Sequence, residues 1–347
     1  KLRNKKLMII YSGKPYIDVR KSFFSFLPKQ VSIQDKNKIV DFWIEKLKKN
    51  PFLHDKVEFD VAVTAYDFEI KKKLKSYLPN KISTKTKKKL EFLYKDIFIK
   101  NIKKNSNSNL NKISKKIYYL SLLQKKFSIK KSRKKNKENV KSILKDCKQY
   151  GIIPFAQAAR HGFVAKGLID SLVSKKVLSQ KRSIELQKVV NTVTSNFLED
   201  INLVIKKKMT KSLFFGKYGH LRPGAYDITS KNYKEMKNTF FEKTFISEKH
   251  KFKLNIQEKN KINILLSKEK IDLNHETLIN YIIESIELRE FSKFIFSKSI
   301  DNIFRLLMEI VPKKLKNKEI ISYFSINEIL SDKASIRLFL KRKNEYE

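Results

Sequence analysis

The strongest constraint on the fold is a long stretch near the C-terminus, in which apolar residues recur at helical spacing from Leu273 to Val311. This spacing puts the apolar side chains on one side of a helix, and that side must be buried against other elements. Pro312 follows at once, and a proline cannot continue a helix. Because the periodicity is helical almost throughout from Pro154 onward, the sequence predicts a mainly α-helical protein.

Signs of β-structure are confined to the N-terminal part. Two short apolar runs, Leu7 to Tyr11 and Tyr16 to Val19, surround a Ser-Gly-Lys-Pro turn and predict two short strands. Apolar and polar residues alternate from Val57 to Thr64, which predicts a further strand with one buried face. The predicted class is therefore α+β, mainly α, in which a small β-containing segment, residues 1–66, packs on a helical domain, residues 67–347.

The remaining segments give more local predictions. Ser32 is a predicted N-cap, Pro154 suits the first turn of a helix, and Ser179 can cap a long helix. Aromatic residues from Arg20 to Pro28 suggest a loop, and the Asn and Ser residues of 105–109 suggest a polar break. The predicted helices are Ser32–Lys49, Asp67–Tyr77, Ser83–Lys104, a helical hairpin to about Gln149, Pro154–Leu178, Ser179–Lys208, Asn232–Phe245, Ile326–Leu330 and Lys333–Lys343.

Length and composition narrow the class of protein. The 347 residues are enough for a sizeable core, and 12% aromatic content argues against disorder. No apolar run is long enough for a transmembrane helix, and the apolar run at the N-terminus is too short for a signal peptide. The single Cys147 cannot form an intrachain disulfide, and no metal-type cysteine cluster exists. We therefore expect a cytoplasmic protein without a membrane span.

The formal net charge of +43 raises the question of an anionic partner. Nucleic acid is one candidate, but a bias toward the amino acids of AT-rich codons explains the same excess of lysine. The lysines are spread over every predicted helix, and the densest run, Lys125 to Lys141, has no aromatic residue except Phe127 for base stacking. We do not expect nucleic acid as the partner, and a basic nucleic-acid-binding helical protein remains the alternative.

Glycine and arginine are rare in this chain and gather in a few segments. The segment from Phe215 to Thr229, FGKYGHLRPGAYDIT, is called the glycine loop below. Its backbone N–H groups and Arg222 could bind one anionic group, and Asp227 could orient His220. A tight connection between two helices, with His220 as a cap, is the structural alternative.

Two further segments carry candidate polar groups. Arg160 and His161 lie in an otherwise apolar, Ala- and Gly-rich helix, where they could face a ligand or serve close helix packing. His54 and Lys56 precede the predicted strand and could point into a cleft or simply be polar residues at its edge. No Walker loop, dinucleotide fingerprint or zinc motif is present.

At these segments the chain resembles the middle region of large phosphoenolpyruvate synthase-like proteins, which are related to pyruvate phosphate dikinase and rifampin phosphotransferase. The resemblance is to a branch often seen near surface-polysaccharide genes. Phe24 and Ala225 depart from it, because Asn and Thr are expected there. Five pieces spanning nearly the whole chain carry the resemblance: GKPYIDVRKSFFSFLP (Gly13–Pro28), NPFLHDKVEFDVAVTAYDF (Asn50–Phe68), PFAQAARHGFVAKGLIDSLV (Pro154–Val173), KYGHLRPGAYDITS (Lys217–Ser230) and REFSKFIFSKSIDNIFRLL (Arg289–Leu307).

This resemblance implies a three-part phosphotransferase. An ATP-grasp domain binds ATP and Mg, a swivelling domain carries a phosphorylatable His, and a mostly helical domain between them holds a small-molecule acceptor. The phosphoryl group passes from ATP to the His and then to the acceptor, with release of AMP and phosphate. This chain looks like the acceptor-binding part alone, so ATP and Mg belong to a missing domain and His220 is not the phosphocarrier. The chain does not begin with Met, which fits a fragment or a split gene.

The resemblance also suggests roles for single residues. Arg222 and Arg160 would bind the transferring phosphate or an acidic acceptor, while His220 and Asp227 would orient or deprotonate an acceptor hydroxyl. The acceptor stays open between pyruvate, a sugar and a lipid-linked precursor, and a non-catalytic remnant of a split gene is a further alternative. The other expected binding residues are His161, Gly219, Gly224, Tyr226, Arg20, His54 and Lys56.

Overall fold

The computed structural model describes residues 7–11, 14–102, 109–190, 193–236, 241 and 252–346. It is mainly helical, with 71% helix and sixteen α-helices within these ranges, and it has a two-stranded antiparallel hairpin near the N-terminus. The predicted fold class is thus confirmed. The elements are β1 (Met8–Tyr11), β2 (Lys14–Ile17), α1 (Val19–Phe26), α2 (Ile33–Lys49), α3 (Ile70–Ser76), α4 (Thr84–Ile102), α5 (Asn109–Gln124), α6 (Arg133–Asp146), α7 (Ile153–Ser174), α8 (Gln180–Val189), α9 (Val193–Ile205), α10 (Lys211–Tyr218), α11 (Tyr233–Met236), α12 (Ile256–Lys268), α13 (His275–Ile310), α14 (Lys318–Ser322), α15 (Ile326–Leu330) and α16 (Ile336–Tyr346).

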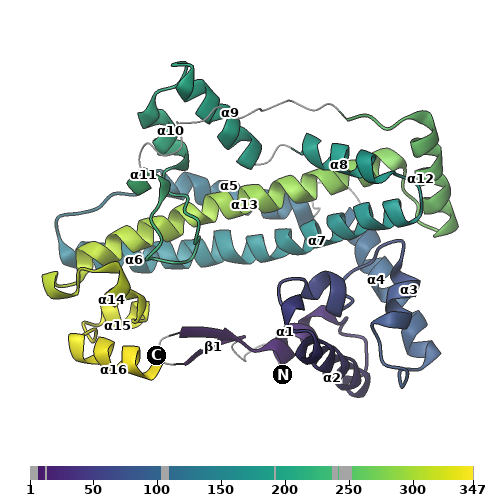
Figure 1. Ribbon diagram of the computed structural model, residues 1–347, viewed down its shortest axis with the longest axis horizontal. Helices are drawn as coiled ribbons and strands as arrows, with labels where there is room; N and C mark the ends of the chain where they lie inside the picture. Colours follow the sequence, from purple (N-terminus) through teal and green to yellow (C-terminus); the bar gives the residue numbers. More distant parts are fainter. Residues whose placement is uncertain are drawn as a thin grey trace.

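Two long helices, α7 and α13, lie side by side through the middle of the molecule (Figure 1). They run antiparallel, since Gly162 of α7 meets Arg289 of α13, while Gly151, in the helical turn just before α7, meets the later Phe296. At Gly151 an added Cβ would lie 2.8 Å from Cβ of Phe296 and 2.9 Å from Cδ2 of Leu120 in α5. Glycine is therefore needed here because three helices approach closely, and its φ lies outside the left-handed region.

The prediction that Pro154 starts a helix is only partly right. The backbone is already helical before it, because a π-helical turn, Cys147–Ile152, joins α6 to α7 without a break. Proline has no N–H to donate to the carbonyl four residues earlier, and such a wide turn accommodates the missing bond. In Figure 1, α6 and α7 accordingly follow one another along nearly one line.

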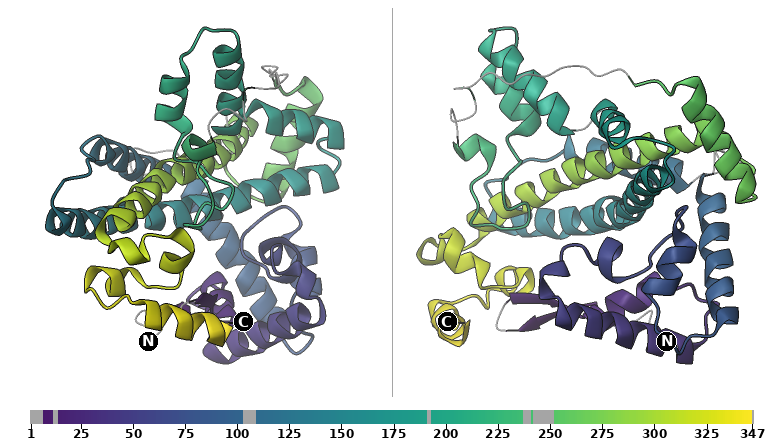
Figure 2. Two further views of the ribbon diagram at one scale, coloured as in Figure 1. Left: turned by 60° about the vertical axis from the view of Figure 1, so that its left-hand side comes forward. Right: turned by 45° about the vertical axis from the view of Figure 1, so that its right-hand side comes forward.

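The N-terminal helices α1 to α4 pack beneath the central pair (Figures 1 and 2). Ser32 caps α2 as predicted, by accepting a hydrogen bond from the backbone N–H of Asp35. The loop predicted from Arg20 to Pro28 is wrong, because α1 covers most of it. Asp18 caps this helix, and Phe23, whose ring is buried against that of Trp43, belongs to its inner face.

The predicted strand from Val57 to Thr64 is also wrong. Val57–Val61 forms a π-helical turn, and Ala62 directly after it is extended. A strand needs a partner for its backbone groups, and in the described part of the chain the two hairpin strands pair with each other. Here the backbone bonds are made locally, from the N–H of Asp60 to Lys56 and from that of Ala62 to Val57. Burial against helices thus overrides the strand preference of the valines.

The remaining helices cover the far side and one end of the central pair (Figure 2). The long helix predicted from Ser179 to Lys208 is wrong, because Val190 is extended and α8 and α9 are separate helices. Of the helix predicted from Asn232 to Phe245, only α11 lies within described residues, together with the single residue Phe241. Residues 237–240 and 242–250 lie outside them, as does most of the predicted polar break at 105–109.

The C-terminal helices α14 to α16 pack on the end of α13. None of the helices in the described ranges combines the length and the apolarity that crossing a bilayer requires. The division between residues 66 and 67 stays a prediction, although the largest buried cluster contains residues on both sides of it, such as Tyr66 and Phe68.

Candidate functional site

A cavity of about 670 Å³ lies between α7 and the N-terminal helices. Its walls come from α7, α4, the start of α5, the connection from α1 to α2, the segment after the π-helix Val57–Val61, and Tyr281 of α13. This volume falls within the range of pockets that bind small molecules. Both Arg160 and His161 line the cavity, together with Gln157 and Val164 at helical spacing on the same face of α7.

Arg160 is an exposed guanidinium that no acidic side chain neutralises among the described residues. Within the described ranges its one hydrogen bond goes from Nη2 to Oγ of Ser25, at 3.2 Å. Ser25 in turn donates to the carbonyl of Ser22, at 2.7 Å, which fixes the hydroxyl as an acceptor for the guanidinium. A guanidinium has five N–H donors, so most of those of Arg160 stay free for a ligand.

His161 is a buried, neutral imidazole with one fixed hydrogen bond. Its Nδ1 lies 2.9 Å from the hydroxyl of Tyr281 across the contact between α7 and α13. Burial lowers the pKa of His161 to about 4, so the ring carries no charge at neutral pH. Burial also raises the pKa of Tyr281, so the phenol keeps its proton.

Aromatic rings form much of the remaining wall. Tyr66 stacks on Phe98, with ring centroids 5.2 Å apart, and Phe98 meets Tyr281 edge to face. The buried hydroxyl of Tyr94 donates to the carbonyl of Val63, at 2.9 Å, so it does not compete for a ligand. The cavity therefore combines a rigid apolar wall with a few polar groups.

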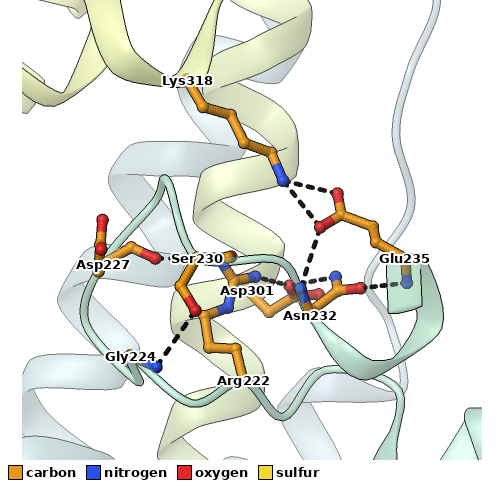
Figure 3. A network of polar contacts seen from close by, with 8 residues as sticks. All are labelled: Arg222, Gly224, Asp227, Ser230, Asn232, Glu235, Asp301 and Lys318. Atoms are coloured by element: carbon orange, nitrogen blue, oxygen red, sulfur yellow. Dashed lines mark hydrogen bonds and ion pairs between the residues drawn. The ribbon is translucent and has the colours of Figure 1, made fainter. Parts of the chain in front are cut away.

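Arg222, the main candidate of the glycine loop, lies in a different place. It forms an ion pair with Asp301 of α13, and the two side chains are only 4% and 6% exposed. Asn232 donates to the same carboxylate oxygen, at 2.9 Å, and Glu235, which accepts from the backbone N–H of Asn232, pairs with Lys318 of α14 at 2.7 Å (Figure 3). This network ties the loop to α13 and to the C-terminal helices, and Arg222 does not line the cavity.

His220 is buried beside Arg222 and does not line the cavity. Its Nε2 lies 3.1 Å from the carbonyl of Phe294, to which it donates, and its ring packs on that phenyl ring. Burial lowers the pKa of His220 to about 4, which leaves Nδ1 as an acceptor, buried and with no partner among the described residues. The expected pairing with Asp227 is not observed, because the carboxylate of Asp227 accepts from Thr229.

The other residues of the glycine loop have packing roles. A Cβ at Gly219 would clash with the carbonyl oxygen of Phe215, and Gly224 donates its N–H to Ser230 Oγ at 3.2 Å (Figure 3). Tyr226 is exposed and stacks on Phe296. Together these contacts show a tight connection held against α13.

Three further expected binding residues lie outside the cavity. Arg20 forms an exposed ion pair with Asp41. His54 is exposed, with Nδ1 3.0 Å from the carbonyl of Pro51, and the exposed Lys56 precedes the π-helix Val57–Val61. The structure therefore brings together only Arg160 and His161 of the expected residues at this cavity.

Sequence reasoning missed Tyr281, Tyr66 and Gln157 as cavity residues. The sequence could have indicated Gln157, because it lies three residues before Arg160 on a predicted helix and therefore shares a face with it. Tyr281 is 120 residues away from His161 in sequence, so no local pattern could have joined them. No group of three or more His, Cys, Asp or Glu side chains in the described ranges could hold a metal ion.

No protein-family model, no curated protein and no solved structure gives a significant match to the chain.

Proposed function

We propose that this chain is the acceptor-binding helical part of an ATP-dependent phosphotransferase similar to phosphoenolpyruvate synthase and pyruvate phosphate dikinase. ATP, Mg and the phosphorylated His belong, in this proposal, to other domains of the same polypeptide or to separate chains. The role of this chain is to bind and orient the acceptor in the cavity beside Arg160 and His161.

The observation that carries the proposal is the spatial arrangement of the five segments that resemble this family. Three of them contribute residues to the wall of the cavity beside Arg160, namely Gly13–Pro28, Asn50–Phe68 and Pro154–Val173. The other two, Lys217–Ser230 and Arg289–Leu307, pack against each other and meet through Arg222 and Asp301. Segments far apart in the chain thus converge on one cavity and on one supporting network.

The chemistry of the cavity supports this role. Phosphoryl transfer depends mainly on positioning and on stabilisation of negative charge. The free donors of Arg160 can hold an anionic group, and the apolar wall around Phe98 and Phe163 can keep water from competing with the acceptor.

Within this proposal Arg160, and not Arg222, binds the reactant. The charge of Arg222 is already neutralised by Asp301, and its remaining bonds go to backbone carbonyls of the glycine loop and of Ser230. Releasing it would leave a buried carboxylate without its partner, which is costly. Arg222 instead holds the glycine loop on α13.

A reconstitution experiment tests the proposal. The chain is mixed with the ATP-grasp and phospho-His domains of a phosphoenolpyruvate synthase-like protein, ATP and Mg²⁺. Pyruvate, a sugar and an aromatic carboxylic acid are added in turn, and AMP release is followed. We expect at least one of these compounds to stimulate AMP release.

A cavity-filling variant locates the activity. Ala156→Trp puts a large ring into the cavity and should abolish the stimulation. Ile184→Trp, at an exposed position of α8 away from the cavity, should keep it. Absence of stimulation by every compound, or equal rates for the two variants, would contradict the proposal.

A further inference from the structure

The hydrogen bond between Tyr281 and His161 determines which groups the cavity offers to a ligand. The hydroxyl of Tyr281 is buried and lies 2.9 Å from Nδ1 of His161, and in the arrangement proposed below it donates its hydrogen to this nitrogen. In a neutral imidazole whose Nδ1 accepts, the proton is on Nε2. His161 therefore carries an N–H donor on the nitrogen that is not bonded to Tyr281.

This Nε2–H is accessible from the cavity. His161 lines the cavity, and Nε2 has no protein partner among the described residues. It is also not one of the fully buried unpartnered atoms, which are His220 Nδ1, Ser285 Oγ, Arg289 Nε and Ser292 Oγ. Nε2 therefore has some exposed surface, and in the arrangement proposed below it faces the cavity.

The charged residues that line the cavity favour a ligand with one negative charge. Its charged lining residues are Arg160, Lys29 and Glu58, two cations and one anion, and the neutral His161 adds none. No ion pair within 4.0 Å joins these three groups in the described part of the chain. The net excess is a single positive charge, so one negative charge on a ligand balances it.

We propose that the cavity binds an organic monocarboxylate with a bulky, ring-containing body. Its carboxylate accepts hydrogen bonds from Arg160 and from Nε2–H of His161, and its body lies against the aromatic wall that includes Phe98. A carboxylate accepts several hydrogen bonds and matches a guanidinium fork, whereas a phosphate dianion would leave one charge unbalanced. The cavity volume of about 670 Å³ fits a drug-sized molecule.

This inference rests on the proposed function in that the monocarboxylate would be the phosphoryl acceptor. Its test needs neither ATP nor partner domains. Binding without phosphoryl transfer would contradict the proposed function alone, and transfer with a neutral acceptor, unaffected by changes at Arg160, would contradict this inference alone.

Two matched fluorescent probes test the need for a negative charge. Anilinonaphthalene sulfonate is an aromatic monoanion, and phenylnaphthylamine has the same rings without the sulfonate. For the full chain we expect Arg160→Gln to weaken binding of the anionic probe about tenfold or more, with the neutral probe changed less than about twofold. Arg337→Gln, which removes an exposed arginine of α16, should change neither affinity.

The carboxylate itself is tested with naphthoate and naphthyl phosphate as competitors of the anionic probe. We expect naphthoate to compete more strongly at a pH where the phosphate is a dianion. The proposal would be overturned if Arg160→Gln weakened the binding of both probes equally or of neither. Stronger competition by naphthyl phosphate than by naphthoate would also overturn it.

A second variant tests the His161 donor through an observable that packing alone does not change. Tyr281→Phe keeps the ring and removes the hydroxyl, so His161 loses the bond that selects its tautomer. Nitrogen-15 NMR of the ring, identified by its loss in His161→Gln, should show Nε2–H in the wild type and a mixture of tautomers in Tyr281→Phe. The same variant should weaken binding of the anionic probe several-fold and leave binding of the neutral probe unchanged. A wild-type ring protonated on Nδ1 would overturn the proposal.

Discussion

Arg222 of the glycine loop and Asp301 of α13 form an ion pair with both side chains almost completely buried, at 4% and 6% exposed. The guanidinium also lies over the ring of Phe304, 5.0 Å from its centroid. Asn232 supplies a further hydrogen bond to the carboxylate. Since the desolvation of both groups is offset only while they stay paired, this contact fixes the loop in one place.

Removal of one partner of this pair should strongly destabilise the protein. We expect Asp301→Ala to lower the free energy of unfolding by about 3 to 5 kcal/mol, because a buried guanidinium is left without its counter-ion. Urea unfolding followed by circular dichroism measures the difference.

The exposed pair of Arg20 and Asp41 is the matched control. Its side chains are 50% and 55% exposed, so Asp41→Ala should change the free energy of unfolding by no more than about 1 kcal/mol. Similar values for the two variants would show that the pair of Arg222 and Asp301 is not buried as described.

Two glycine substitutions should have effects of opposite sign. Gly151→Ala places a methyl group 2.8 Å from Cβ of Phe296 and should cost about 1 to 3 kcal/mol by overpacking. Gly216→Ala lies in α10, where an added Cβ meets nothing within 4 Å, and should stabilise by about 0.5 to 1 kcal/mol. Thermal melting of both variants checks this, and stabilisation by Gly151→Ala would refute the close contact of the turn Cys147–Ile152 with α5 and α13.

Acid should destabilise the protein through its two buried histidines. The pKa values of His161 and His220 are lowered to about 4, whereas an unfolded histidine titrates near about 6.5. Between these values the unfolded chain binds more protons than the folded one, so stability falls as the pH falls from 6.5 to 4. We expect each histidine to lower the free energy of unfolding by about 3 kcal/mol over this window.

Unfolding free energies measured at several pH values test this directly. His161→Gln and His220→Gln should each reduce the slope of the unfolding free energy against pH between pH 6.5 and 4. The double variant should reduce this slope further, because the two side chains share no hydrogen-bond partner. A slope that stays the same in both single variants would mean that neither imidazole is buried as a neutral ring.

Nucleic-acid binding should be weak and non-specific despite the net charge of +43. Lysines spread over many helices give only a general attraction, which counter-ions screen. We expect duplex DNA to be retained in filter binding at low salt and released at about 0.15 M salt. A complex with a dissociation constant near 10⁻⁸ M or lower at about that salt would instead favour the nucleic-acid-binding alternative.

The parts of the fold that local chemistry determines could be predicted from the sequence. The helical spacing before Pro312 predicts α13, and Ser32 predicts the start of α2. The strand expected at Val57–Thr64 is wrong although its alternation is typical of a strand. In the described ranges β1 and β2 pair with each other, and Val57–Val61 forms a π-helical turn instead. Helix α1 was missed because its aromatic residues were read as a loop, although Asp18 is a good N-cap.

The candidate site could be predicted only in part for a similar reason. Arg160 and His161 stand out locally as polar residues in an apolar helix, and both line the cavity. The ion pair that occupies Arg222 depends on Asp301, 79 residues later in the chain, so its burial could not be inferred from the glycine loop itself. Rare residue types single out the segments, but contacts across helices decide which of them line the cavity.

The most direct measurement is the acceptor dependence of AMP release by the reconstituted system with Arg160→Gln. We expect the acceptor concentration for half-maximal rate to rise about tenfold or more, because a charged hydrogen bond to the acceptor is lost, while Arg337→Gln behaves as the wild type. An unchanged acceptor dependence in Arg160→Gln would contradict the assignment of the cavity as the acceptor site.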